Sequence, residues 1–153
     1  MQPEIRYGVT QWSLDGDGPE TILRAAELGF RSIHLSSGAL DGRWRLDGDG
    51  VRAAYVRAAS EAEVRIDALS PGDLNDLGLG SPKGSATADR CALSIRIAID
   101  AALDMGVPLV FLPSFRAGEI RTDGDLRRTA EVLSETCELV SGTSVTIATE
   151  NTL

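Results

Sequence analysis

The strongest constraint on the fold of this chain is a strict alternation of two apolar patterns from one end to the other. Short apolar runs typical of strands alternate with longer stretches that repeat apolar residues every three or four positions, as helices do. The expected strands are Ile5–Thr10, Arg31–Ser36, Val64–Leu69, Val107–Pro113 and Val145–Glu150. The expected helices are Glu20–Leu28, Val51–Ala62, Ala88–Met105 and Leu126–Ser141. This order predicts an α/β fold of parallel (β/α) units with right-handed crossovers.

Turn residues and spacing predict how the helices begin, end and pack. Gly29, Gly106 and Gly142 follow three of the helices, and Asp17 is the expected N-cap of the first, with Pro19 in its first turn. The segment from Ser70 to Ser85 is rich in Gly, Asp and Pro and is expected to be a loop. The core face of the last helix is expected at Leu126, Ala130, Leu133, Cys137 and Val140.

Five strands and four helices fit two architectures, and the whole chain, residues 1–153, is expected to form one domain. One is a five-stranded doubly wound sheet, and the other is an incomplete TIM barrel. Length favours the doubly wound sheet, since a complete barrel needs about 250 residues. The residues at the strand ends have to decide between the two.

Composition excludes several classes of protein. A net charge of −8 and scattered arginines argue against a nucleic-acid surface. No apolar stretch reaches the roughly 18 residues of a membrane span, and the N-terminus does not resemble a signal peptide. The two cysteines lack metal-site spacing and read as packing residues, so a cytoplasmic location is expected.

The carboxyl ends of the expected strands carry the residues that could perform chemistry. Trp12, His34, Ser114 and Glu150 are the candidates, and Gln11, Ser36, Ser70 and Phe115 lie beside them. Aromatic and hydroxyl groups with one acid suit a small polyhydroxylated ligand. His34, the only histidine, could instead be a packed core residue or a metal ligand, and Glu150 could be a solvated acid.

Other site types of α/β proteins are not matched. Residues 10–14 lack the hydroxyl- and glycine-rich loop that cradles a flavin phosphate, and no GxGxxG motif opens a helix. Gln11, Ser70 and Glu150 stand where a phosphoacceptor receiver domain has acids and a lysine. The three Asp-Gly-Asp turns do not match the spacing of a calcium loop.

Four segments in order resemble the sugar phosphate isomerase/epimerase family, the xylose isomerase-like TIM barrels. They are residues 25–35 (AAELGFRSIHL), 98–107 (AIDAALDMGV), 110–115 (VFLPSF) and 147–151 (IATEN). The likeness runs through nearly the whole chain and favours the incomplete barrel, its first five strands of eight. Where this family usually has Glu at the end of strand two, the chain has His34, which puts the substrate contacts there in doubt.

The resemblance implies a metal-dependent sugar or sugar-phosphate isomerase or epimerase that transfers a proton next to a carbonyl. It places catalysis and metal binding on Glu150, with Mg²⁺ or Mn²⁺ as the metal, and Trp12, His34 and Ser114 as substrate contacts. The other metal ligands of the family lie on strands six to eight. The chain alone is therefore expected to be inactive, as a truncation or a natural fragment.

Five barrel strands without their partners leave two open edges. We therefore expect the chain to associate with another copy of itself or with a complementing chain. A non-catalytic barrel fragment that binds a small polyol or a partner chain, and an independent doubly wound domain with an unrelated site, remain the alternatives.

Overall fold

The computed structural model describes residues 7–150, so Ile5, Arg6 and Asn151, which the sequence patterns include, lie outside the described residues. The strands are β1 (Val9–Thr10), β2 (Ser32–Ser36), β3 (Arg65–Ser70), β4 (Leu109–Leu112) and β5 (Thr146–Thr149). The α-helices are α1 (Glu20–Glu27), α2 (Val51–Ala62), α3 (Leu74–Leu77), α4 (Ala86–Met105) and α5 (Asp123–Leu139). Two short 3-10 helices, η1 (Gln11–Ser13) and η2 (Arg116–Gly118), follow β1 and β4.

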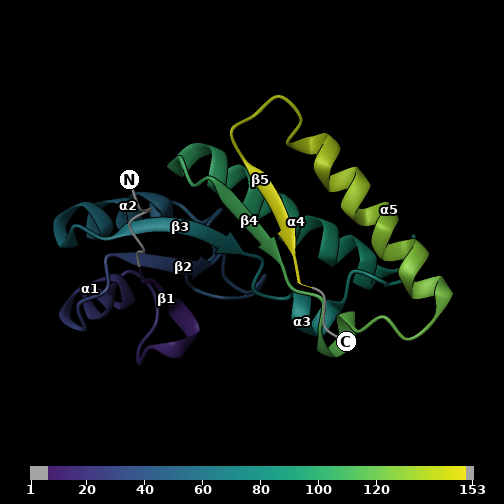
Figure 1. Ribbon diagram of the computed structural model, residues 1–153, viewed down its shortest axis with the longest axis horizontal. Coiled ribbons are helices and arrows are strands. Elements are labelled where there is room, and N and C mark those ends of the chain that lie inside the picture. Colours follow the sequence, from purple (N-terminus) through teal and green to yellow (C-terminus); the bar gives the residue numbers. More distant parts are fainter. Residues whose placement is uncertain (1–6, 151–153) are drawn as a thin grey trace, which may run out of the picture.

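The five strands form one parallel sheet in the order β1-β2-β3-β4-β5 (Figure 1). A doubly wound sheet reverses its strand order at a switch point, whereas a barrel adds each new strand beside the last. The sequential order therefore confirms the prediction of an incomplete βα barrel and excludes the doubly wound alternative. The barrel is not closed: among the described residues, β1 pairs only with β2, and β5 pairs only with β4.

Alternate side chains of the strands divide the sheet into a helix-covered face and an open face, because successive strand residues point to opposite sides. On β2 and β4, four fully buried residues belong to the core that the helices cover: Ile33 and Leu35 of β2, and Val110 and Leu112 of β4. The residues between them, His34 on β2 and Phe111 on β4, are only partly buried and line a pocket. The sheet thus has one helix-covered face and one open to a ligand.

Helix α1 begins at Glu20 and ends before Gly29 as the sequence predicts, but its N-cap is not the predicted one. Gly29, at φ +86°, closes it: the amide of Phe30 donates to Ala25 O at 2.9 Å and that of Gly29 donates to Ala26 O at 2.9 Å, a Schellman motif. The N-cap position is Pro19, and no side chain caps it. The prediction of Asp17 as the cap is wrong, because its carboxylate accepts the indole N–H of Trp44 at 2.9 Å instead.

The predicted core face of α5 is largely wrong. The buried residues of this helix are Thr129, Val132 and Thr136, with Val140 just beyond its end. The predicted stripe is largely uncovered: Leu126 is 53% exposed, Ala130 and Cys137 are exposed and Leu133 is half-buried. Figure 1 shows α5 at the outer side of the helix layer, where neighbours cover only one side of it. The apolar period shows that a helix forms, but not which side meets its neighbours.

The segment expected to be a loop, Ser70–Ser85, contains α3, so the structure has a fifth α-helix that the sequence patterns do not predict. Leu74 and Leu79 are buried in the core, and Asp73 accepts the backbone N–H of Leu40 at 2.7 Å. Burial of two leucines, each contributing about 1.5–3 kcal/mol, holds this segment in place, and α3 packs against η2 and α4.

Among the described residues, the outer edges of β1 and β5 are open. Association with another copy or with a complementing chain remains a prediction. Within residues 7–150, none of the helices has both the length and the apolar character needed to span a bilayer.

Candidate functional site

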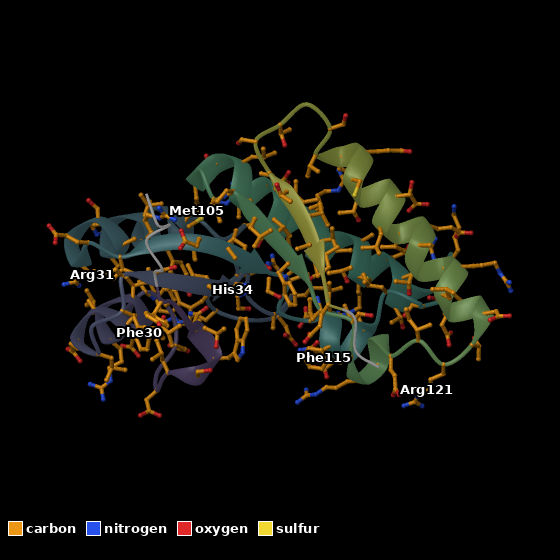
Figure 2. All side chains as sticks on the ribbon, in the orientation of Figure 1. Phe30, Arg31, His34, Met105, Phe115 and Arg121 are labelled. Atoms are coloured by element: carbon orange, nitrogen blue, oxygen red, sulfur yellow. The ribbon has the colours of Figure 1, made fainter. Side chains whose placement is uncertain are left out.

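A pocket of about 660 Å³ lies where the strands end. It falls within the range of small-molecule sites, roughly 300–1,000 Å³. In Figure 2, His34 and Phe115 lie near the middle of the view, where the strand arrowheads converge. The pocket is lined by Thr10, Trp12, His34, Ser36, Ser70, Pro71, Gly72, Asn75, Leu109, Phe111, Pro113, Phe115, Arg116 and Glu150.

His34 lies between two aromatic rings on the open face of the sheet. Its ring centroid is 4.9 Å from that of Trp12 and 5.7 Å from that of Phe111, both in edge-to-face geometry. Burial lowers the pKa of His34, and a hydrogen bond to the backbone of Leu69 partly offsets this effect. The imidazole is therefore neutral at pH 7.

The Nε2 atom of His34 is buried and has no hydrogen-bond partner among the described residues. Leaving such an atom unpaired costs about 1–3 kcal/mol. The hydrogen bond to Leu69 raises the pKa, which is the effect of an imidazole N–H that donates to a carbonyl. In the neutral ring the other nitrogen, Nε2, is then an acceptor, suited to a hydroxyl group of a ligand.

Gln11, which follows β1, does not line the pocket but joins the elements around it through hydrogen bonds. Its amide nitrogen donates to Tyr55 Oη at 3.0 Å and to Thr21 Oγ1 at 3.2 Å, and its Oε1 accepts the backbone N–H of Ser36 at 2.9 Å. These bonds join η1 to β2, α1 and α2. They fix the position of Trp12, which is 57% exposed at the rim beside His34.

Glu150 follows β5 and lines the pocket, half-buried. The register places it there: Ala148 pairs with Phe111, whose side chain faces the pocket, and Glu150 comes two residues later on the same side. Thr149, between them, donates its hydroxyl to Leu112 O at 3.0 Å and fixes the end of the strand. The sequence therefore predicts the place of this carboxylate correctly.

Ser114 is the one predicted site residue that does not line the pocket. It is 5% exposed, and its hydroxyl donates to Gly118 O at 3.2 Å within the turn that contains η2. Its neighbours Pro113 and Phe115 line the pocket instead. The structure thus brings Trp12, His34 and Glu150 together and leaves Ser114 in the supporting turn.

Outside the strands, two polar residues of the pocket are not predicted from the sequence: Asn75 on α3 and Arg116 on η2. The side-chain oxygen of Asn75 is buried without a hydrogen-bond partner among the described residues. Neither residue belongs to a strand, so no two-residue period points to them. The only signal for Arg116 is its place two residues after Ser114, just beyond the expected strand end.

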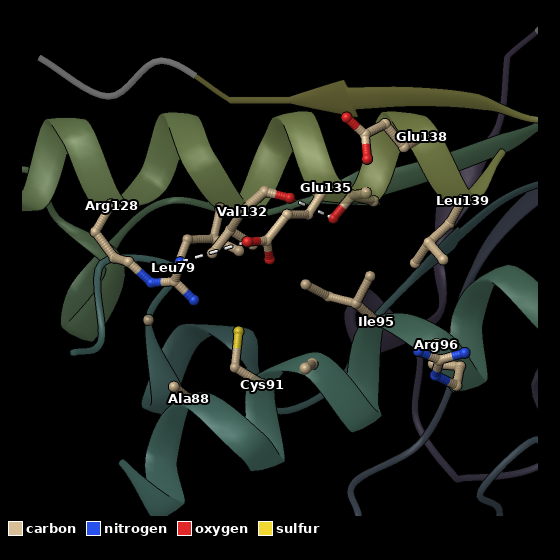
Figure 3. A pocket seen from close by; sticks show the side chains of 13 residues that line it. Leu79, Ala88, Cys91, Ile95, Arg96, Arg128, Val132, Glu135, Glu138 and Leu139 are labelled. Atoms are coloured by element: carbon tan, nitrogen blue, oxygen red, sulfur yellow. Dashed lines mark hydrogen bonds and ion pairs between the residues drawn. The ribbon is translucent and has the colours of Figure 1, made fainter. Parts of the chain in front are cut away.

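A second cavity, of about 400 Å³, lies between α4 and α5 (Figure 3). Cys91, Ile95, Val132 and Leu139 give it an apolar lining, and Arg128 pairs with Glu135 at 3.9 Å along α5 at its wall. Burial raises the pKa of the Cys91 thiol to about 11, so it stays protonated and is a poor nucleophile. The cavity lies away from the strand ends and gathers no catalytic groups.

The strands are parallel and in sequential order, the helices cover one face of the sheet, and a pocket lies at the strand ends. These features define a βα-barrel protein with a small-molecule site. Residues 22–153 match the family described as xylose isomerase-like TIM barrel, and the chain belongs to this family. The prediction made from the four sequence segments is confirmed.

One curated protein is similar to the chain in sequence, and two solved structures are similar to it in fold. The chain is 36% identical over 149 residues to a 2-epi-5-epi-valiolone 7-phosphate 2-epimerase of Actinoplanes sp., covering 97% of this chain and 53% of that protein. Its fold matches a D-tagatose 3-epimerase-like protein, with a TM-score of 0.72, 17% identity and coverage of 96% of this chain and 53% of that one. It also matches an L-ribulose 3-epimerase, with a TM-score of 0.66, 21% identity and coverage of 94% and 48%. The chain thus spans about half the length of each.

Proposed function

We propose that the chain supplies part of the active site of a sugar or sugar-phosphate isomerase or epimerase. The observation that carries the proposal is the pocket at the strand ends, which gathers Glu150, His34 and Trp12. Membership of the xylose isomerase-like family and the 36% identity to a named epimerase support this reaction class.

The proposed catalytic group is Glu150. A carboxylate in the pocket can remove the hydrogen from a carbon next to a carbonyl, leaving the electron pair in an enediolate whose negative charge is on oxygen. Return of a proton to the same carbon from the other face gives the epimer; its return to the neighbouring carbon, with a proton moving from the hydroxyl oxygen to the former carbonyl oxygen, gives the isomer. Glu150 is the only acidic side chain among the described lining residues, so a second acid or base has to come from elsewhere.

The proposed substrate contacts are Trp12 and His34. A sugar ring presents C–H groups on its faces and hydroxyl groups at its edges. The half-exposed indole of Trp12 suits the C–H face, and the unpaired Nε2 of His34 suits a hydroxyl donor.

The described residues do not by themselves fit a divalent metal. Within residues 7–150, no three side chains of the types His, Cys, Asp or Glu lie close enough together to hold one. A carboxylate oxygen is a suitable ligand for Mg²⁺ or Mn²⁺, but one ligand does not make a site. The metal role of Glu150 stays a prediction for a complete barrel, and the proton transfer above uses no metal.

Binding can be tested on the chain itself, which has two tryptophans that act as reporter and control. Trp12 lines the pocket, whereas the indole N–H of Trp44 is engaged by Asp17 outside it. In a ¹⁵N-labelled chain, D-tagatose, D-fructose and their phosphates should shift the indole signal of Trp12 and not that of Trp44. Equal shifts of both signals, or none up to 50-fold excess ligand, would refute the binding site.

The catalytic role of Glu150 needs the rest of the barrel, so it is tested on a fusion of this chain with the part of the Actinoplanes epimerase that it does not cover. NMR follows deuterium entering the substrate from D₂O. Glu150→Gln should lower this rate about 100-fold or more, since it removes the general base. Glu138→Gln, which changes an exposed carboxylate on α5, should leave it unchanged. Equal rates in the Glu150→Gln variant and the parent would refute the role.

A further inference from the structure

One corner of the pocket is formed by two segments that the sequence did not link to a site, α3 and η2. They pack against each other and bring Asn75 and Arg116 to the same pocket. We propose that these two residues form a subsite for a phosphorylated sugar or cyclitol, in which Arg116 binds the phosphate group and Asn75 binds a neighbouring hydroxyl group. This inference rests on the proposed function, because it assigns a substrate class to the same pocket.

Arg116 is the only arginine or lysine among the described residues that line the pocket. His34 is neutral there, so the guanidinium is the pocket's positive charge. A guanidinium presents five N–H donors in a planar fork that matches two phosphate oxygens. The same pocket contains Glu150, whose negative charge repels a phosphate. These charges orient a phosphorylated substrate with its phosphate at Arg116.

The backbone holds Arg116 in an unusual conformation. Its φ is +57°, in the left-handed region that residues other than glycine rarely adopt. Close packing against α3 maintains this turn: a Cβ added to Gly78 would lie 2.3 Å from the carbonyl oxygen of Ala117, the next residue after Arg116. Only glycine permits this approach. The position of Arg116 is therefore fixed by a tertiary contact and not by its own sequence preference.

The guanidinium of Arg116 has little to hold it within the protein. Its ion-pair partner is Asp76 on α3, at 3.6 Å, and the two side chains are 69% and 78% exposed. Such exposed pairs contribute little to stability. The arrangement leaves most of the guanidinium exposed to solvent and able to exchange Asp76 for a stronger anion.

Asn75 supplies the second, directional contact. Its side-chain oxygen is buried and has no partner among the described residues, so a hydroxyl donor is missing. A sugar phosphate carries hydroxyl groups on the carbons next to its phosphate ester. With Arg116 on the phosphate and Asn75 on a neighbouring hydroxyl, the subsite distinguishes a phosphorylated substrate from inorganic phosphate by added affinity.

The test measures binding of inorganic phosphate and of D-fructose 6-phosphate to the chain by calorimetry at low salt. Arg116→Gln should weaken both about tenfold or more, the effect of losing a charged hydrogen bond. Arg121→Gln is the matched control, because Arg121 pairs with Glu119 at 2.6 Å, does not line the pocket and lies beyond η2 in Figure 2. Asp76→Asn removes the competing carboxylate and should tighten binding about two- to fivefold.

The inference is overturned if Arg116→Gln and Arg121→Gln bind phosphate equally, or if the unmodified chain shows no saturable binding. A failure of the subsite remains distinct from a failure of the proposed function. D-fructose without phosphate should still shift the Trp12 signal in Arg116→Gln, and Glu150→Gln should still bind phosphate. If no ligand shifts the Trp12 signal of the unmodified chain but phosphate still binds to it, the proposed function fails and the subsite stands.

Discussion

Replacing Gly78 by alanine tests whether the contact between α3 and η2 supports the pocket. Gly78 has φ +75° and ψ 134°, a conformation open essentially to glycine only, and an alanine held there costs about 1–3 kcal/mol. Its Cβ would lie 2.3 Å from Ala117 O and 2.7 Å from the carbonyl carbon of that residue. Both are backbone atoms, so relieving the overlap requires η2 to move, at about 1–3 kcal/mol more.

The expected loss of unfolding free energy for Gly78→Ala is therefore about 2–6 kcal/mol, measured by urea denaturation. Gly84→Ala is the matched control. Gly84 also has a positive φ, +79°, but nothing lies within 4 Å of its added Cβ, so only the backbone cost of about 1–2 kcal/mol applies. Since η2 carries Arg116, Gly78→Ala should also weaken phosphate binding while Gly84→Ala should not. An equal loss of stability in the two variants would refute the reasoning.

Three further predictions follow from the same contacts. Gln11→Ala should cost about 1–3 kcal/mol in urea denaturation, because it leaves Tyr55 Oη and the backbone N–H of Ser36 without their partner; a loss below 0.5 kcal/mol would contradict this. The pKa of His34 is below its ordinary 6.5 in the folded state, so the unfolded chain binds the proton more tightly. This residue should therefore lower stability as pH falls below about 6.5 and have no effect above it. His34→Gln should flatten that part of the pH profile, and an unchanged slope between pH 7.5 and 5 would argue against it. Val132→Ala, on the buried side of α5, should lower the free energy of unfolding by about 1.5–2 kcal/mol, whereas Leu126→Ala should lower it by less than about 0.5 kcal/mol. The reverse order would show that the core face expected from the sequence is the correct one.

The sequence by itself predicts parallel (β/α) units and the residues at the strand ends, whereas the order of the strands in the sheet decides between a barrel and a doubly wound sheet. The two-residue period of a strand is local, so the pattern that buries Val110 and Leu112 also places Phe111 on the open face. The same counting places Glu150 on the pocket side of β5 and His34 on that of β2. These positions follow once the strands are recognised and taken as parallel.

The tertiary structure alone decides how the segments outside the strands complete the pocket. Gly78 approaches Ala117 closely although the two residues lie about 40 positions apart in the sequence. No local sequence pattern therefore predicts this contact. That contact brings Arg116 and Asn75 to the site, while Ser114, which looks like a strand-end residue, is used inside the turn. Strand faces are fixed by chain geometry, whereas the placement of loops and the rotation of a helix such as α5 depend on which neighbours they meet.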